Sequence, residues 1–340
     1  MENNNIILSV KDLQTQFKTG KKIVTAVKGV TFDVKRNKSL CIVGESGCGK
    51  SVSAHSILQL LPANGSIAAG TVEYYPTEKE KIVLNNLKRN SRQIRKIRGQ
   101  DIAMIFQDPM STLNPVYTIG EQIVENLRQH EKISKKEAKE RVIKLLGELG
   151  IPTPEKRFDQ YPHEFSGGMK QRVMIAIAMI CNPKILIADE PTTALDVTIQ
   201  AQILELIKKM QKEHGTSLVL ITHNMGIVAE VADEVAVMYM GHVVEFGTVE
   251  QIFTEPKHPY TKALMASVPV LGMDKTKNLH TIPGATPDVA TIFTGCEFAE
   301  RCQHAKTECF KRFPKDTVFE NNHRVRCLLY EDGGAEGEES

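Results

Sequence analysis

Gly44-Glu45-Ser46-Gly47-Cys48-Gly49-Lys50-Ser51 is the stretch that decides the fold of this 340-residue chain. It matches the pattern G-x-x-x-x-G-K-[S/T] at every fixed position. A short apolar run, residues 39–43, precedes it, and residues 52–61 are expected to form a helix that ends before Pro62. In a strand–glycine loop–helix unit, backbone N–H groups turn inward around a polyphosphate at the N-terminus of the helix. The stretch therefore predicts a nucleotide-binding site.

Two side chains of this phosphate loop, defined as residues 44–51, have separate expected roles. Lys50 is expected to reach the β- and γ-phosphates, and Ser51 is expected to ligate Mg²⁺. The other expected nucleotide contacts from the loop and the following residue are Gly44, Ser46, Gly47, Cys48, Gly49 and Val52.

Composition is typical of a soluble globular protein. Apolar residues make up 41% and charged residues 25%, and the net charge of +2 does not favour nucleic acid as a partner. The first five residues lack the basic start of a signal peptide. The longest apolar run, residues 173–181, is nine residues long, well short of the roughly 20 needed to cross a bilayer. A cytosolic protein, or one peripheral to a membrane built by other chains, is expected.

Strands and helices alternate through much of the chain. Residues 7–10 and 24–34 read as an antiparallel pair, whereas 101–106, 184–188 and 217–221 read as buried strands. Helices are expected within 119–150, at 166–180 and at 197–213, and a hairpin is expected around Gly241. Within 119–150, Ser134 and Glu137 are expected to form a capping box, and an apolar stripe is expected at Val142, Leu145, Leu146 and Leu149. This order predicts an α/β fold with a mostly parallel sheet, an antiparallel β subdomain, and a helical subdomain at about 108–180.

Three segments are expected along the chain. Residues 1–254 should form the nucleotide-binding domain, and 255–330 a small loop-rich C-terminal domain with four cysteines. Residues 331–340 carry five acidic side chains and no basic one, which predicts a disordered tail.

Polar side chains follow three of the expected strands. Asp189 and Glu190 follow residues 185–188, a position where an Asp can hold Mg²⁺ and a Glu can polarise the water that attacks the γ-phosphate. Gln107 and His223 also come after strands. Gln107 can orient water or Mg²⁺, and His223 can contact the γ-phosphate. Either of these two alone would be an ordinary loop residue, but all four can converge at the carboxyl edge of one sheet.

A second anion site is predicted where the 166–180 helix begins, at Ser166-Gly167-Gly168. A chain with two such sites needs either two nucleotides or one nucleotide shared with a partner.

The order of these motifs resembles the nucleotide-binding subunit of ATP-binding-cassette (ABC) transporters, with a P-loop NTPase core, over about residues 6–250. The resemblance implies that Phe17 stacks on adenine, that Glu190 is the catalytic base, and that His223 is the switch histidine. It also implies that Ser166–Gly168 caps the ATP of an opposite subunit in a head-to-tail dimer, with Asp196 in a loop that communicates across it. Met169 departs from the glutamine that is common after the glycines, a change not expected to abolish activity.

Flanking segments resemble the peptide and nickel importer branch, most closely its dipeptide/oligopeptide ATPases of the D-subunit type. These segments are residues 106–115, 258–261, 282–284, 295–296 and 301–302. The resemblance implies ATP-driven peptide import at the cytoplasmic face of the membrane. The implied partners are a second, different ATPase chain, two permeases and an extracellular binding protein. Import of nickel or another solute is an alternative. A soluble ABC ATPase of DNA repair or translation is an alternative of another class, disfavoured by the single phosphate loop and the lack of a long heptad run.

Four of the seven cysteines, Cys296, Cys302, Cys309 and Cys327, follow the spacing C-x5-C-x6-C-x17-C. A four-cysteine zinc site usually contains C-x2–4-C pairs, which are absent here. The wider spacing suits an iron–sulfur cluster, for which four thiolates are also the usual ligands. Four unliganded cysteines are the remaining reading. The resemblance to the peptide-importer branch favours [4Fe–4S], with Zn²⁺ as the alternative.

Overall fold

The computed structural model describes residues 5–108, 112–193, 195–267 and 282–331. The chain divides into two compact units. The first unit comprises Met1–Leu8, Val34–Lys38 and Tyr74–Ile221, and the second comprises Ser9–Asp33, Ser39–Glu73 and Thr222–Ser340.

The first unit contains three parallel strands in the order β6-β7-β8. They are β6 (Ile102–Ile105), β7 (Ile185–Asp189) and β8 (Ser217–Thr222). Every residue of β7 and β8 is buried, as expected of parallel strands covered on both faces. The predicted buried strands are therefore confirmed, and their carboxyl ends lie at one edge.

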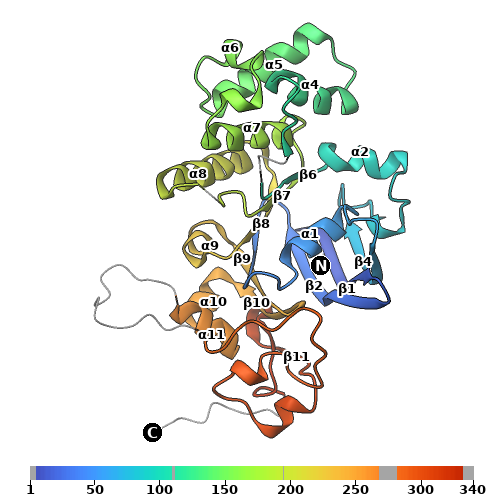
Figure 1. The fold of residues 1–340 in the computed structure, drawn as a ribbon, viewed down its shortest axis with the longest axis vertical. Helices are drawn as coiled ribbons and strands as arrows, with labels where there is room; N and C mark the ends of the chain where they lie inside the picture. The colour runs from blue at the N-terminus through green and yellow to red at the C-terminus, as the bar shows by residue number, and fades with distance from the viewer. Residues whose placement is uncertain (1–4, 109–111, 194, 268–281, 332–340) are drawn as a thin grey trace. The chain divides into compact units, whose positions relative to one another are not determined.

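Helices make up most of the rest of this unit, and Figure 1 shows α4, α5 and α6 grouped beside α7. The helical elements are α2 (Arg92–Gln100), α4 (Ile119–His130), α5 (Lys135–Glu148), α6 (Pro154–Phe158), α7 (Gly167–Met179) and α8 (Val197–His214). The short strand β5 (Ile82–Val83) and the 3-10 turns η2 (Leu84–Asn86) and η3 (Pro162–Glu164) complete it. The predicted stripe on α5 is buried at Val142, Leu145, Leu146 and Leu149. Of these helices, α4, α5, α6 and α7 lie within the predicted helical subdomain, whose bounds stay a prediction.

Helix starts in this region follow ordinary capping chemistry, with one correction. Ser134 caps α5 by accepting a hydrogen bond from the Glu137 backbone N–H at 3.2 Å, but only this half of the predicted capping box is seen. The complete box belongs to α4, where Thr118 and Glu121 bond reciprocally. Suitable residues three apart in sequence make a capping box possible. Whether the second hydrogen bond forms depends on the rotamer of the acidic side chain.

The second unit contains two sheets. One has the order β2-β1-β4, formed by β1 (Ile6–Thr19), β2 (Lys22–Lys35) and β4 (Gly65–Tyr74). The other has the order β11-β12-β10-β9-β3, formed by β3 (Ser39–Val43), β9 (Glu234–Tyr239), β10 (His242–Thr248), β11 (Asp316–Val318) and β12 (Arg324–Arg326). β3 and β9 are parallel, and β9 and β10 form the predicted hairpin around Gly241.

The helix after the phosphate loop differs from its predicted bounds. α1 runs from Lys50 to Ile57 and so begins inside the motif rather than at Val52. Gly49, with φ of 101°, is its N-cap, so the helix starts at the next residue. It ends before Pro62 is reached, because Gln59 has a left-handed φ of 51°.

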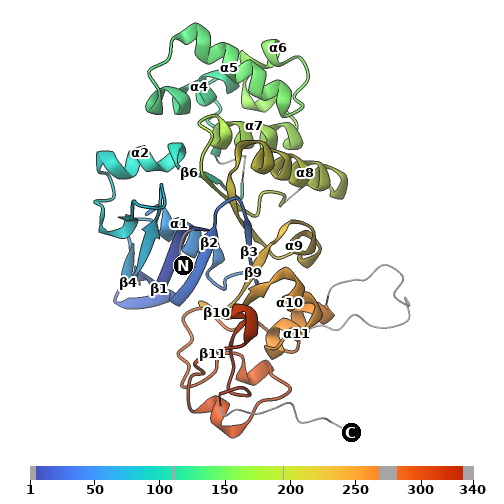
Figure 2. The ribbon, with the colours of Figure 1, turned by 180° about the vertical axis from the view of Figure 1, so that it is seen from behind.

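The C-terminal region, residues 255–331, is joined to the sheet of the second unit. β12 pairs with β10, with Val325 opposite Glu245, and β11 pairs with β12. The helical elements nearby are α9 (Met225–Val231), α10 (Val249–Thr254), α11 (Pro259–Ala266), η4 (Ala299–Arg301), η5 (Thr307–Phe310) and η6 (Glu320–Asn322), and Figure 2 shows α10 and α11 beside each other. The boundary at residue 254 stays a prediction, and the predicted tail lies outside the described residues from 332 onward.

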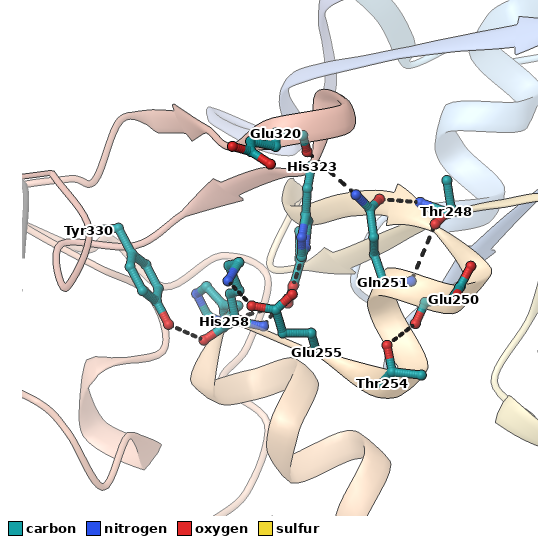
Figure 3. A network of polar contacts seen from close by, with 11 residues as sticks. Thr248, Glu250, Gln251, Thr254, Glu255, His258, Glu320, His323 and Tyr330 are labelled. Atoms are coloured by element: carbon teal, nitrogen blue, oxygen red, sulfur yellow. Dashed lines mark hydrogen bonds and ion pairs between the residues drawn. The ribbon is translucent and has the colours of Figure 1, made fainter. Parts of the chain in front are cut away.

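Buried polar contacts tie this region together around Glu245, which is fully buried. Figure 3 shows polar contacts of this region from close by, with His258 and His323 labelled. Its carboxylate accepts hydrogen bonds from the backbone N–H groups of Lys257 (2.7 Å) and His258 (2.9 Å) and pairs with the His323 ring at 2.7 Å. Burial alone would raise the Glu245 pKa, but these hydrogen bonds outweigh it and lower the pKa. Burial lowers the pKa of His258 to about 4, so its neutral Nδ1 accepts the Tyr260 N–H at neutral pH.

Candidate nucleotide site

Backbone geometry explains the glycines of the phosphate loop. Gly44 has φ of 149° and Gly49 has φ of 101°. A Cβ on Gly44 would lie 2.1 Å from the Met238 carbonyl oxygen, and one on Gly49 would lie 2.7 Å from the Ala26 carbonyl oxygen. Only glycine fits both positions, because neighbouring strands press against the loop backbone.

Lys50 lies folded over this loop. Its Nζ donates to the carbonyl oxygens of Gly44 (2.8 Å) and Glu45 (2.9 Å) and lies 3.8 Å from Cys48 Sγ. The residue is only 5% exposed, so the ammonium group is held at the centre of the loop. Ser51 and Val52 follow it in the first turn of α1 and are half-buried.

Two other predicted residues lie in the same unit as the loop. Phe17 is half-buried near the end of β1, and its ring lies against Gly65 of β4, where a Cβ would meet Phe17 Cε1 at 2.8 Å. His223 directly follows β8 and is exposed. Their predicted contacts with adenine and the γ-phosphate stay predictions.

The first unit brings Gln107 and Glu190 together. Gln107 Nε2 donates to Glu190 Oε2 at 3.1 Å, and Thr193 Oγ1 donates to the same oxygen at 3.0 Å. Glu190 has φ of 45°, an unfavourable conformation for a non-glycine residue that costs about 1–3 kcal/mol. Its backbone N–H donates to Ile221 O of β8 at 2.9 Å, which holds it in place. Asp189, the last residue of β7, is 3% exposed.

The helix α7 begins as predicted. Ser166 is its N-cap and accepts from the Met169 N–H at 3.4 Å. Ser166 and Gly167 are exposed, whereas Phe165 before them is buried. Gly168 packs on Ile199 of α8, where a Cβ would come within 3.0 Å of Ile199 Cγ2.

Asp196 is the N-cap of α8 and is exposed; it accepts from the Ile199 N–H at 2.9 Å. Since Ile199 also contacts Gly168, the starts of α7 and α8 lie close together in the first unit.

The predicted residues thus fall into two groups. Phe17, the phosphate loop with Val52, and His223 belong to the second unit. Gln107, Ser166–Gly168, Asp189, Glu190 and Asp196 belong to the first. Within these groups the structure pairs Gln107 with Glu190 directly.

Two contacts of these residues escaped sequence reasoning. Thr193 donates a hydrogen bond to Glu190, and the only sequence feature that could have indicated this bond is that Thr193 comes three residues after Glu190. Glu45 is an unspecified position of the loop motif, yet it bonds Arg301, 256 residues away, and no local pattern indicates such a pair.

The four clustered cysteines come near one another in space. Cys296 N–H donates to Cys309 O at 2.7 Å. The pKa of Cys296 is raised to about 12 and that of Cys327 to about 11, chiefly by burial and in smaller part by the neighbouring cysteines. Among the described residues, however, no three His, Cys, Asp or Glu side chains are arranged to hold a metal ion. The predicted [4Fe–4S] or zinc site is therefore not supported by this arrangement, in which the thiols are gathered without a closed ligand shell.

Comparisons with known proteins cover nearly the whole chain. Residues 27–193 match the family described as "ABC transporter", and residues 244–309 match "Oligopeptide/dipeptide transporter, C-terminal region". The chain is 49% identical to the dipeptide transport ATP-binding protein DppD of Bacillus subtilis, over 95% of this chain and 94% of that protein. It is also 49% identical to the oligopeptide transport ATP-binding protein OppD of the same organism, over 95% and 88% respectively.

Solved structures give the same result for the core. The dimeric, post-hydrolysis structure of the ATP-binding cassette MJ0796 bound to ADP and Pi matches with a TM-score of 0.63 and 28% identity. The match covers 72% of this chain and 99% of that chain. In the parts of the chain that the structure describes, no helix is long and apolar enough to span a membrane. The chain belongs to the ATP-binding proteins of the ABC transporter family, in the branch that carries the oligopeptide/dipeptide transporter C-terminal region.

Proposed function

We propose that this protein binds and hydrolyses ATP to power the uptake of di- and oligopeptides through a membrane ABC importer. The observation that carries this proposal is 49% identity to dipeptide and oligopeptide transport ATP-binding proteins along almost the whole chain. The glycine-built phosphate loop and the Gln107–Glu190 pair supply the chemistry that such a subunit needs.

Each predicted residue has a role in this reaction. Glu190 takes the proton of the attacking water, and Gln107 orients that water. Lys50 binds the β- and γ-phosphates, His223 contacts the γ-phosphate, and Phe17 stacks on adenine. The hydrogen bonds that Glu190 Oε2 receives from Gln107 and Thr193 support its part, because they fix the carboxylate in one orientation.

Oxygen-bearing side chains suit the Mg²⁺ that accompanies ATP. The Ser51 hydroxyl in the first turn of α1, the buried Asp189 carboxylate and the Gln107 carbonyl are the hard donors that Mg²⁺ prefers. When bound, Mg²⁺ would neutralise charge on the β- and γ-phosphates.

A second ATPase subunit completes each site in this proposal. The exposed Ser166 and Gly167, at the N-terminus of the 13-residue α7, suit the γ-phosphate of an ATP held by a partner. Asp196, exposed beside them, would face the same partner. We infer a head-to-tail dimer, with a different ATPase chain as partner. It would lie on two permeases at the cytoplasmic face of the membrane and serve an extracellular binding protein.

Uptake of labelled peptide tests the proposal. Vesicles should contain this chain with its permeases, second ATPase subunit and binding protein. Labelled dipeptide or oligopeptide should accumulate with ATP and should not accumulate with a non-hydrolysable analogue. Uptake of nickel without peptide would overturn the peptide assignment. Stable binding to DNA or ribosomes, without permeases, would favour a soluble ABC ATPase instead.

The four cysteines are proposed to bind an iron–sulfur cluster when the protein is assembled in the cell. Support comes from the nearness of the four cysteines in the C-terminal region, where Cys309 and Cys327 are buried and Cys296 and Cys302 are half-buried, and from the preference of such clusters for four thiolates. A bound cluster would cross-link the loop-rich C-terminal region, which has few regular elements of its own.

Metal analysis of anaerobically purified protein decides this point. About four iron atoms and four acid-labile sulfides per chain are expected for a [4Fe–4S] cluster. Cys302→Ser should lower this content, whereas Cys181→Ser, outside the group, should not. One zinc per chain without sulfide would refute the cluster in favour of zinc, and neither metal would leave four ordinary thiols.

A further inference from the structure

A bidentate ion pair joins the C-terminal region to the phosphate loop. Arg301 Nη1 lies 2.7 Å from Glu45 Oε2, and Nη2 lies 2.9 Å from Glu45 Oε1. The Arg301 side chain is 5% exposed and that of Glu45 is 22% exposed. Parallel double contacts of this kind are the strongest ion pairs that arginine makes.

Two further donors of Arg301 are also engaged. Nε donates to the Pro283 carbonyl oxygen at 2.8 Å, and Nη1 donates to Tyr239 Oη at 3.2 Å. The guanidinium lies 5.8 Å from the centre of the Tyr239 ring and 5.9 Å from that of Phe298. Arg301 is thus held in one orientation, in which Nη1 and Nη2 face the Glu45 carboxylate.

Glu45 is held at its side chain, its backbone N–H and its carbonyl. Thr286 Oγ1 donates to Glu45 Oε2 at 3.0 Å, and the Glu45 N–H donates to Tyr260 Oη at 2.9 Å. The Glu45 carbonyl accepts from Lys50 Nζ. Tyr260, Thr286 and Arg301 all come from the C-terminal region, so this region sets the conformation of the first turn of the loop.

Three of the segments that resemble the peptide-importer branch lie at this contact. Residues 258–261 supply Tyr260, residues 282–284 supply Pro283, and residues 301–302 supply Arg301. The Tyr239, Tyr260 and Phe298 rings pack together behind the contact, with centroids 4.7–5.4 Å apart.

Electrostatics gives the ion pair a further consequence. Glu45 places a carboxylate within a loop whose ligand is a polyphosphate. Without Arg301, the partly buried Glu45 carboxylate would repel the phosphates of a nucleotide bound at this loop. The hydrogen bonds from Arg301 hold the pKa of Glu45 below its usual range, so the group is ionised at neutral pH and needs a compensating cation.

We propose that Arg301 is a positioning residue for ATP binding: it neutralises Glu45 and holds the first turn of the phosphate loop in its binding form. The inference rests on the proposed ATP binding at this loop. It assigns to the C-terminal region a direct part in nucleotide affinity, carried by one side chain.

Binding of Mg-ATP analogue and steady-state ATPase kinetics, both in the assembled transporter, test this role. Arg301→Gln should raise the Kd and the KM for ATP about tenfold, with kcat little changed, because it leaves the Glu45 charge unpaired beside the phosphates. Arg301→Lys keeps the charge but loses the second hydrogen bond of the fork, so it should raise the Kd by about threefold, less than Arg301→Gln does. The double variant Glu45→Gln with Arg301→Gln should also return to within about threefold, because neither charge remains.

A matched control lies in the same region. Arg312 is paired with Glu331 and Glu308 away from the loop, so Arg312→Gln should leave ATP affinity unchanged. If Arg301→Gln does not fold, the Lys and double variants still decide the matter. Unchanged affinity in Arg301→Gln, or a double variant as weak as Arg301→Gln, would overturn the inference. Failure of the unaltered protein to bind ATP would instead refute the proposed nucleotide site.

Discussion

Replacing Glu190 by glutamine is expected to slow ATP hydrolysis by about 10²–10⁴-fold while leaving ATP binding intact. The amide oxygen of glutamine can still accept the hydrogen bonds from Gln107 and Thr193, so the local geometry should survive. The amide cannot take a proton from water, so only the chemical step is lost. Nucleotide binding and phosphate release by the assembled transporter measure the two effects separately.

The matched control for this variant is Glu140→Gln on α5, an exposed glutamate of the same unit. It makes the same change of charge without touching the site and should hydrolyse ATP normally. Normal hydrolysis by Glu190→Gln in the assembled transporter would show that another group is the base.

Lys50→Ala is expected to weaken ATP binding by at least about a hundredfold. The substitution removes the only side-chain cation of residues 44–51, and it also removes the two hydrogen bonds that hold the carbonyls of Gly44 and Glu45. Both losses act on the same ligand, since an ammonium close to a polyphosphate in a partly buried site is worth several kcal/mol. Calorimetric titration with Mg-ATP analogue is the direct measurement.

Lys144→Ala controls for the loss of a lysine, because the Lys144 side chain is 80% exposed on α5. A thermal melt of each variant separates lost binding from lost folding. ATP affinity equal to that of the unaltered protein in Lys50→Ala would mean that the loop does not bind phosphate as we propose.

The local pattern of apolar and polar residues is enough to predict most of the helices and strands. The buried strands β7 and β8 read directly as short apolar runs, and the stripe on α5 follows the helical period. Element ends were less accurate: α1 begins at Lys50, because the left-handed Gly49 caps it, and stops at Ile57. Which backbone conformation a glycine adopts is settled by the strands packed against it, and these lie far away in sequence.

The phosphate loop, the glycine-led start of α7 and the order of strands and helices were determined by the sequence alone, because each depends on residues only a few positions apart. Tertiary structure alone decided that Gln107 and Thr193 bond one oxygen of Glu190 and that Arg301 pairs with Glu45. It also decided that the cysteines gather without a closed ligand shell among the described residues. Glu45 and Arg301 are 256 residues apart, and they come together only because the C-terminal region pairs with β10 through β12 and contacts the loop through Tyr260 of α11. Side-chain pairs this far apart in sequence depend on tertiary packing, whereas helix and strand periodicity relates only residues a few positions apart.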